Sequence, residues 1–134
     1  YGASGALNIR IYTAGPPIIG LSAAVVNISF AGNPIDTGDV RAFVGPQSSG
    51  TEVGSVATFQ GGGGSSFSPQ TWAFEFDFSA FTLGPPQSLS FFFGSELANS
   101  SLDAISIDVL GAPIPAPGAA FALGLLGVTR RRRG

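Results

Sequence analysis

The sequence predicts an all-β fold, an antiparallel β-sandwich of about seven strands. Apolar and polar residues alternate with a period of two in segment after segment, which is typical of strands with one buried and one solvated face. Glycine- and proline-rich turn signals separate these segments at short intervals. Twelve phenylalanines supply enough aromatic surface for a packed core and argue against disorder.

Four of the predicted strands lie in the first half of the chain. Residues 6–13 place three apolar side chains on one face, and residues 25–30 place three more. Residues 40–44 and 52–59 are shorter or less regular. Helical spacing is weak and occurs in this half only around Leu21–Val26. The turn signals are Gly15-Pro16-Pro17, Gly32-Asn33-Pro34 and Gly45-Pro46.

The second half contains the most regular strand. Residues 71–78 alternate four aromatic side chains with four smaller or polar ones, and Glu75 and Asp77 form part of the solvated side. Residues 88–93 and 103–110 complete the set of seven. The spacing of these strands fits a jelly-roll or an immunoglobulin-like topology.

One domain fills most of the chain, and the composition changes after it. Residues 1–111 are predicted to form the sandwich, with the sheet ending near Leu110. Residues 112–118 carry proline at every second position, which indicates an extended spacer because proline donates no ladder hydrogen bond. Residues 119–134 are predicted to be a short apolar helix followed by an arginine cluster. The first residue is Tyr1, as after removal of a signal peptide or in a fragment of a longer chain.

Composition excludes several classes of function. The chain has no histidine, cysteine or lysine, so it lacks an imidazole base, a thiol nucleophile, a Schiff-base amine and the usual zinc ligands. Before the arginine cluster, two arginines stand against eight acidic residues, a net charge of −6 that would repel phosphate. We therefore expect neither enzymatic activity nor nucleic-acid binding.

Oxygen-rich loops are the candidates for ligand binding in the body of the protein. Asp36 and Asp39 lie in one turn, and Glu96 and Asp103 lie in a second. Such carboxylates can hold calcium or cap turns, and the capping interpretation needs fewer assumptions because neither loop has the complete calcium pattern. Trp72, at the head of a phenylalanine-rich face, fits the core better than an exposed, sugar-stacking position.

The segment after the spacer is uniformly apolar and ends in four arginines. A helix from Gly118 to Thr129 would have twelve residues and be about 18 Å long, against about 30 Å for the hydrocarbon core of a bilayer. Snorkelling arginines and local membrane thinning can reduce this mismatch, and the positive-inside rule places the arginines in the cytoplasm. The predicted membrane segment is marked by Ala119, Phe121, Leu123, Leu125, Leu126 and Val128, and the cytoplasmic stop by Arg130, Arg131, Arg132 and Arg133.

The order of proline motif, apolar segment and arginine cluster resembles the PEP-CTERM sorting signal of bacterial exported proteins. The motif positions are Pro115, Ala116 and Pro117, and Ala116 stands where that family usually has glutamate. The resemblance covers about twenty residues. It implies insertion in the membrane and cleavage by a membrane protease-transpeptidase of the exosortase type.

These observations indicate where in the cell the protein acts more clearly than which biochemical activity it has. We expect an exported bacterial protein that is first held in the inner membrane and then reaches the cell surface or the extracellular matrix. Its expected role is structural or adhesive, with the membrane, an exosortase-like protease and extracellular polysaccharide as partners. The alternative is a carbohydrate- or calcium-binding β-sandwich module held by a simple C-terminal membrane anchor. Apart from calcium in that alternative, we expect no cofactor.

Overall fold

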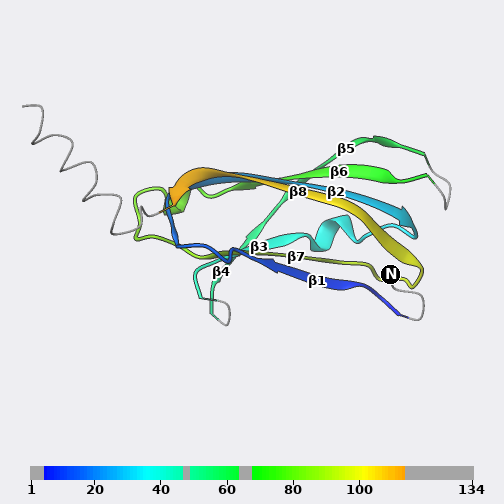
Figure 1. Cartoon of the computed structure of the whole chain (residues 1–134), viewed down its shortest axis with the longest axis horizontal. Coiled ribbons are helices and arrows are strands. Elements are labelled where there is room, and N and C mark those ends of the chain that lie inside the picture. The colour runs from blue at the N-terminus through cyan, green and yellow to red at the C-terminus, as the bar shows by residue number, and fades with distance from the viewer. Residues whose placement is uncertain (1–4, 47–48, 64–67, 114–134) are drawn as a thin grey trace, which may run out of the picture.

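A computed structural model describes residues 5–46, 49–63 and 68–113. Within these residues the chain forms eight strands and two short 3₁₀ helices, and the strands lie in two facing layers (Figure 1). The strands are β1 (Asn8–Tyr12), β2 (Ile18–Gly32), β3 (Arg41–Val44), β4 (Thr51–Gly54), β5 (Val56–Gly62), β6 (Gln70–Asp77), β7 (Leu89–Gly94) and β8 (Ser100–Pro113). The 3₁₀ helices are η1 (Thr37–Asp39) and η2 (Ser79–Phe81).

Each layer is a four-stranded antiparallel sheet. The first sheet has the order β1-β7-β3-β4 and the second the order β5-β6-β2-β8. The prediction of an all-β antiparallel fold is therefore confirmed. Among the described strands, only β3–β4 and β5–β6 are hairpins within one sheet, because the other consecutive strands lie in different sheets. The chain thus passes repeatedly from one layer to the other.

Strand β2 begins earlier than the sequence pattern predicted. It is 15 residues long and includes Leu21–Val26, the segment with weak helical spacing. Gly20 has a φ of 63°, and the register between β2 and β8 shifts between Ile19 and Ala23. This irregularity has the character of a β-bulge, which breaks the alternation of side chains and thereby hides the strand in the sequence.

Residues 52–59, predicted as one strand, belong to two strands in different sheets. Strand β4 ends at Gly54 and β5 begins at Val56, so one residue makes the crossing. That residue, Ser55, donates its hydroxyl to the carbonyl oxygen of Val40 at 2.9 Å. A crossing this short carries no glycine–proline turn signal, and the prediction of a single strand was wrong for this reason.

Strand β8 continues beyond Leu110, where the sheet was expected to end. Its last residue, Pro113, lies opposite Ile18 of β2. Because β8 is the edge strand of its sheet, the missing N–H of Pro113 is tolerated there.

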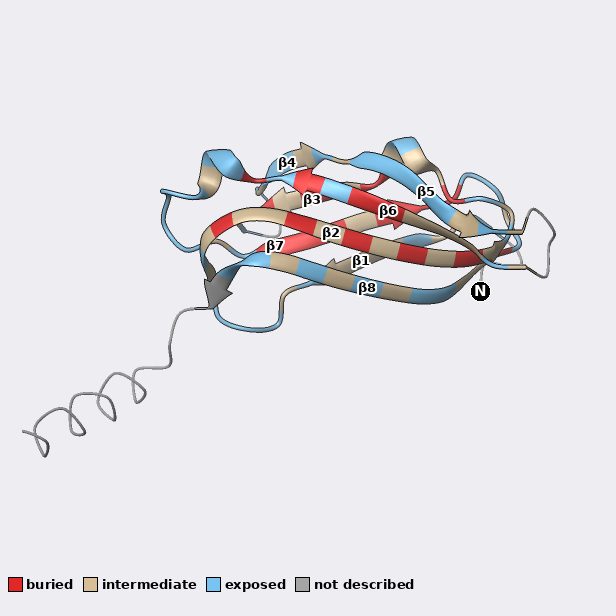
Figure 2. Ribbon diagram, turned by 90° about the horizontal axis from the view of Figure 1, so that it is seen from above, coloured by how far each residue is buried: buried red, intermediate tan, exposed pale blue. Residues whose placement is uncertain are grey.

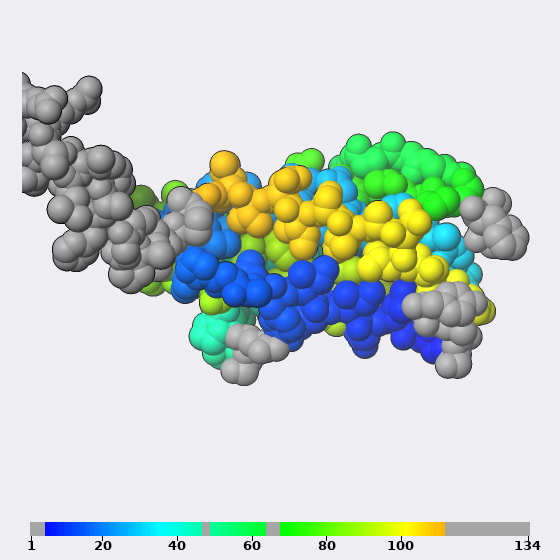
Figure 3. Space-filling view, viewed as in Figure 1, coloured from blue at the N-terminus to red at the C-terminus, as the bar shows by residue number. Residues whose placement is uncertain are grey.

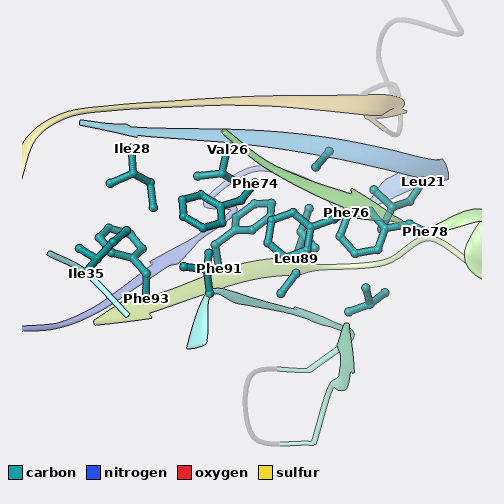
Figure 4. Close-up of a cluster of buried hydrophobic side chains, with 14 of the residues drawn as sticks. Leu21, Val26, Ile28, Ile35, Phe74, Phe76, Phe78, Leu89, Phe91 and Phe93 are labelled. Carbon is teal, nitrogen blue, oxygen red and sulfur yellow. The ribbon is translucent and has the colours of Figure 1, made fainter. Parts of the chain in front are cut away.

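The hydrophobic core lies between the two sheets. Alternate residues of β2 and β6 are buried, which appears in Figure 2 as a repeating colour pattern along these strands. In Figure 4, Val26 and Phe74 of one sheet point toward Phe91 of the other. The ring centroids of Phe76 and Phe91 are 5.3 Å apart across the layers, in the tilted geometry that aromatic pairs favour. The core comprises Leu21, Ala24, Val26, Ile28, Phe30, Ile35, Val40, Ala42, Val44, Phe74, Phe76, Phe78, Leu89, Phe91 and Phe93.

The end of β6 is fixed by a carboxylate cap. The side chain of Asp77, exposed as the sequence predicted, accepts a hydrogen bond from the backbone N–H of Ser79 at 2.8 Å, at the start of η2. This backbone bond, together with a bond from the Ser79 hydroxyl, lowers the pKa of Asp77 below its ordinary value. The charged form of Asp77 therefore favours the folded state.

We expect Phe91→Ala to lower the free energy of unfolding by about 3–5 kcal/mol, because it removes a fully buried ring and leaves a cavity. Urea unfolding followed by circular dichroism measures the change. The control is Leu83→Ala, at a fully exposed position, which should change stability by no more than about 0.5 kcal/mol. Equal unfolding midpoints for the two variants would contradict the position of Phe91 in the core.

Asp77→Ala should lower the melting temperature at neutral pH and have less effect in acid. The folded pKa of Asp77 lies below the unfolded one, so its contribution is present above the unfolded value, about 3.9, and is lost as the pH falls through the folded value. Calorimetric melting of both proteins from pH 7 to pH 2 tests this. A difference in melting temperature that stays constant over that range would rule out the capping role.

Candidate functional site

A cleft of about 370 Å³ opens at one end of the sandwich. It lies where the turn around η1 meets the start of β6 and the loop after β7, and Figure 1 shows η1 between the two layers. Its lining combines one aromatic ring with apolar side chains, carboxylates, a hydroxyl and an amide. The lining residues are Pro34, Ile35, Asp36, Thr37, Gln70, Trp72, Glu96 and Leu97.

Trp72 forms the aromatic side of the cleft. It lies opposite the buried Ile28 in the pairing of β2 with β6, so its side chain is directed between the sheets and packs against the core. The ring is only half-buried, because it stands at the rim of the core, next to the cleft. The sequence pattern favoured a core position for Trp72; in the structure the residue both packs against the core and lines the cleft.

Phe59 extends the aromatic surface beside Trp72. The two residues lie opposite each other in the pairing of β5 with β6, and their ring centroids are 5.3 Å apart at an interplanar angle of 59°. Strand β5 is the edge of its sheet, and Phe59 remains 49% exposed. An aromatic pair of this kind, supported by the core on one side and open to solvent on the other, is suited to contact with a ligand.

Hydrogen bonds between distant segments hold the two loops of the cleft together. The hydroxyl of the fully buried Ser100 donates to the carbonyl oxygen of Asn33 at 2.8 Å. The backbone N–H of Asn33 donates to Asn99 O at 3.2 Å, and that of Asp36 donates to Gly94 O at 3.0 Å. These bonds join the segment after β2 to the segment after β7, so the cleft is built by two parts of the chain that lie far apart in sequence.

Gly32 makes the close approach of these loops feasible. Its φ is 88°, and a Cβ atom at this position would lie 2.1 Å from the carbonyl oxygen of Asn99. A side chain here would both strain the backbone and push the loops apart. The turn signal at Gly32-Asn33-Pro34, which the sequence marked only as the end of a strand, therefore helps to shape the cleft.

The fold brings two of the four calcium candidates to one cleft and gives the other two separate partners. Asp36 and Glu96, one from each predicted loop, both line the cleft. Asp39 forms an ion pair with Arg41, and Asp103 accepts a hydrogen bond from the hydroxyl of Ser29 at 3.3 Å. Asp36 also caps η1 by accepting the Gly38 N–H at 3.0 Å, as the capping interpretation predicted. In the described part of the chain, no three acidic, histidine or cysteine side chains gather in a way that could hold a metal ion.

The two arginines of the sandwich lie on the outer face of the sheet formed by β1, β7, β3 and β4, away from the cleft. The guanidinium of Arg10 lies over the ring of Phe43 at 4.6 Å and over that of Tyr12 at 5.4 Å. Arg41 pairs with Asp39 and also with Glu52, the latter at 3.2 Å. The positive charges of the sandwich are therefore engaged with aromatic faces and carboxylates.

The residues of the predicted sorting signal lie outside the described part of the chain. They are Pro115, Ala116 and Pro117, the apolar positions from Ala119 to Val128, and Arg130 to Arg133. Among the residues that the structure describes, neither 3₁₀ helix has the length or apolarity to cross a membrane. No family model, curated protein or solved structure matches the chain.

Ser100→Ala should destabilise the protein by about 1–3 kcal/mol, because the loop carbonyl of Asn33 loses its buried hydroxyl donor. Denaturant unfolding gives the value. The matched control is Ser101→Ala, one residue along the same strand at a half-buried position, for which we expect a smaller change. If both variants unfold at the same urea concentration, the bond between the two loops does not contribute as argued.

Proposed function

We propose that this chain is an exported bacterial protein of the cell surface or extracellular matrix, directed there by a PEP-CTERM-like sorting signal. The observation that carries the proposal is one continuous arrangement of three parts. Pro115-Ala116-Pro117 comes first, the apolar segment Ala119–Val128 follows, and Arg130–Arg133 comes directly after Thr129. Each part is common by itself, whereas the three in this order form a much more specific signal.

The physical chemistry of the three parts supports a membrane intermediate. The apolar segment gains about 25 cal/mol for each Å² of apolar surface that it removes from water. The four arginines resist transfer across the bilayer and favour the cytoplasmic side, which leaves the sandwich on the exported side. Prolines at every second position favour an extended backbone, and an extended backbone would be accessible to a protease. Cleavage near Pro115–Pro117 would then release the sandwich.

The sandwich has the features of a self-contained cargo. Among the residues that the structure describes, the fifteen core members lie between Leu21 and Phe93, and the last strand ends at Pro113, just before the proline motif. The chain contains no cysteine, so its stability depends on burial and not on the redox state of its compartment.

The order of strands in the sandwich differs from that of an immunoglobulin-like domain. In immunoglobulin-like domains the first two strands share a sheet, whereas β1 and β2 lie in different sheets. Strands β1, β7 and β3 are neighbours in one sheet, and β8, β2 and β6 are neighbours in the other.

Replacement of Arg130–Arg133 by glutamine should leave the fold intact and impair processing, because the cytoplasmic stop is lost. The measurement is the mass of the mature protein isolated from its native cell. For the unaltered chain we expect loss of the residues after a cut near Pro115–Pro117, about 17–20 residues of the sequence. The variant should keep them.

The control is Arg41→Gln, which removes a positive charge from the sandwich and should be processed normally. A mature protein that keeps its arginine cluster and stays with the membrane would identify a simple anchor. Unchanged surface display after neutralisation of the cluster would contradict the sorting proposal altogether.

A further inference from the structure

We propose that the cleft at the end of the sandwich is a binding site for a neutral saccharide. The sugar would stack on Trp72 and donate its hydroxyls to Asp36 and Glu96, which enter the cleft from opposite loops. This inference concerns the sandwich and is independent of the proposed sorting signal, so each can fail without the other.

The aromatic contact is preorganised. Trp72 packs against the core on one side and lies beside the ring of Phe59 at 5.3 Å, so the indole is held in place before any ligand arrives. The C–H face of a pyranose ring is apolar and matches an aromatic face in size. A rigid aromatic side chain loses little conformational entropy on binding. Most of the free energy gained from its contact with the sugar therefore contributes to affinity.

The polar groups of the cleft are those that sugar hydroxyls require. A sugar presents many O–H donors, and the carboxylates of Asp36 and Glu96 are strong acceptors for them. Asp36 is oriented by the hydrogen bond that it accepts from Gly38 N–H at 3.0 Å. Gln70 adds an amide that can both donate and accept, and Thr37 adds a hydroxyl.

The charge and size of the cleft narrow the class of ligand. Its charged lining residues are the two carboxylates, and the arginines of the sandwich lie on the outer face of the other sheet. Phosphorylated or uronic-acid sugars would therefore be repelled. A volume of about 370 Å³ lies near the lower end of the range of about 300–1,000 Å³ for small-molecule sites, and we expect it to accommodate about one or two sugar units.

Trp72 is the single tryptophan of the chain, so its fluorescence reports on the cleft directly. The 134-residue chain is titrated with cellobiose, maltose, lactose and N,N′-diacetylchitobiose, each up to about 100 mM. We expect a saturable change in emission with at least one of them, at a dissociation constant on the order of 1 mM. Addition of EDTA should leave this affinity unchanged, because the proposed contacts need no cation.

Glu96→Ala should weaken binding of that disaccharide about tenfold, since it removes a charged acceptor. Glu96 is exposed, so the fold should survive, and circular dichroism checks this. The matched control is Glu75→Ala, which removes the same charge from an exposed position on β6 and should bind as well as the unaltered chain.

Four results would overturn the inference. The first two are the absence of a saturable response to all four disaccharides, and binding by the Glu96→Ala variant that is as tight as binding by the unaltered chain. The other two are binding of glucuronic acid as tight as that of the best neutral sugar, and loss of binding on addition of EDTA. Release of monosaccharide from a bound disaccharide would likewise replace the binding proposal with a hydrolytic one, since two carboxylates from different segments face the same cleft.

Discussion

The burial of two inner sheet faces against each other is the constraint on which this protein depends. The chain has no cysteine and few charged residues, so neither disulfides nor extensive ion pairing can replace that burial. Phenylalanines from both layers meet across the interface, as the contact between Phe76 and Phe91 illustrates. Most consecutive strands lie in different sheets, so the chain crosses repeatedly between the layers, and the stacking of the sheets positions the loops that connect them.

The cleft lies at the end of the sandwich, where the two sheets stop covering each other. The core closes around Phe74 and Phe93, and Trp72, two residues before Phe74 on β6, is only partly buried. At the same end, η1 and the loop after β7 fold toward each other and are joined through Ser100 and Asn33. The edge strand β5 adds Phe59 beside the uncovered ring. A site of this kind needs no separate scaffold, since the rigid core supplies its orientation.

The two proposals concern different parts of the molecule. The proposed sorting signal would act in delivery, through the composition and order of its prolines, apolar residues and arginines rather than through a precise fold. The cleft concerns contact with a ligand, and it depends on distances between side chains from separate loops. A domain that is delivered to the cell surface and that recognises neutral polysaccharide through its end would combine both proposals in one adhesive role.

Much of the architecture could be predicted from local pattern, because burial of one strand face imposes a period of two on neighbouring residues. Residues 71–78 and 88–93 were placed within one residue of β6 and β7 for this reason. The bulge near Gly20 and the single-residue crossing at Ser55 were missed, since each interrupts the period without a turn signal. The sequence by itself determined the class of fold and the identity of the inward-facing aromatic residues, both of which depend on near neighbours. Only the tertiary structure decided that Asp36 and Glu96 share a cleft with Trp72 while Asp39 and Asp103 lie elsewhere, because that outcome depends on strand pairing and layer stacking across the whole chain.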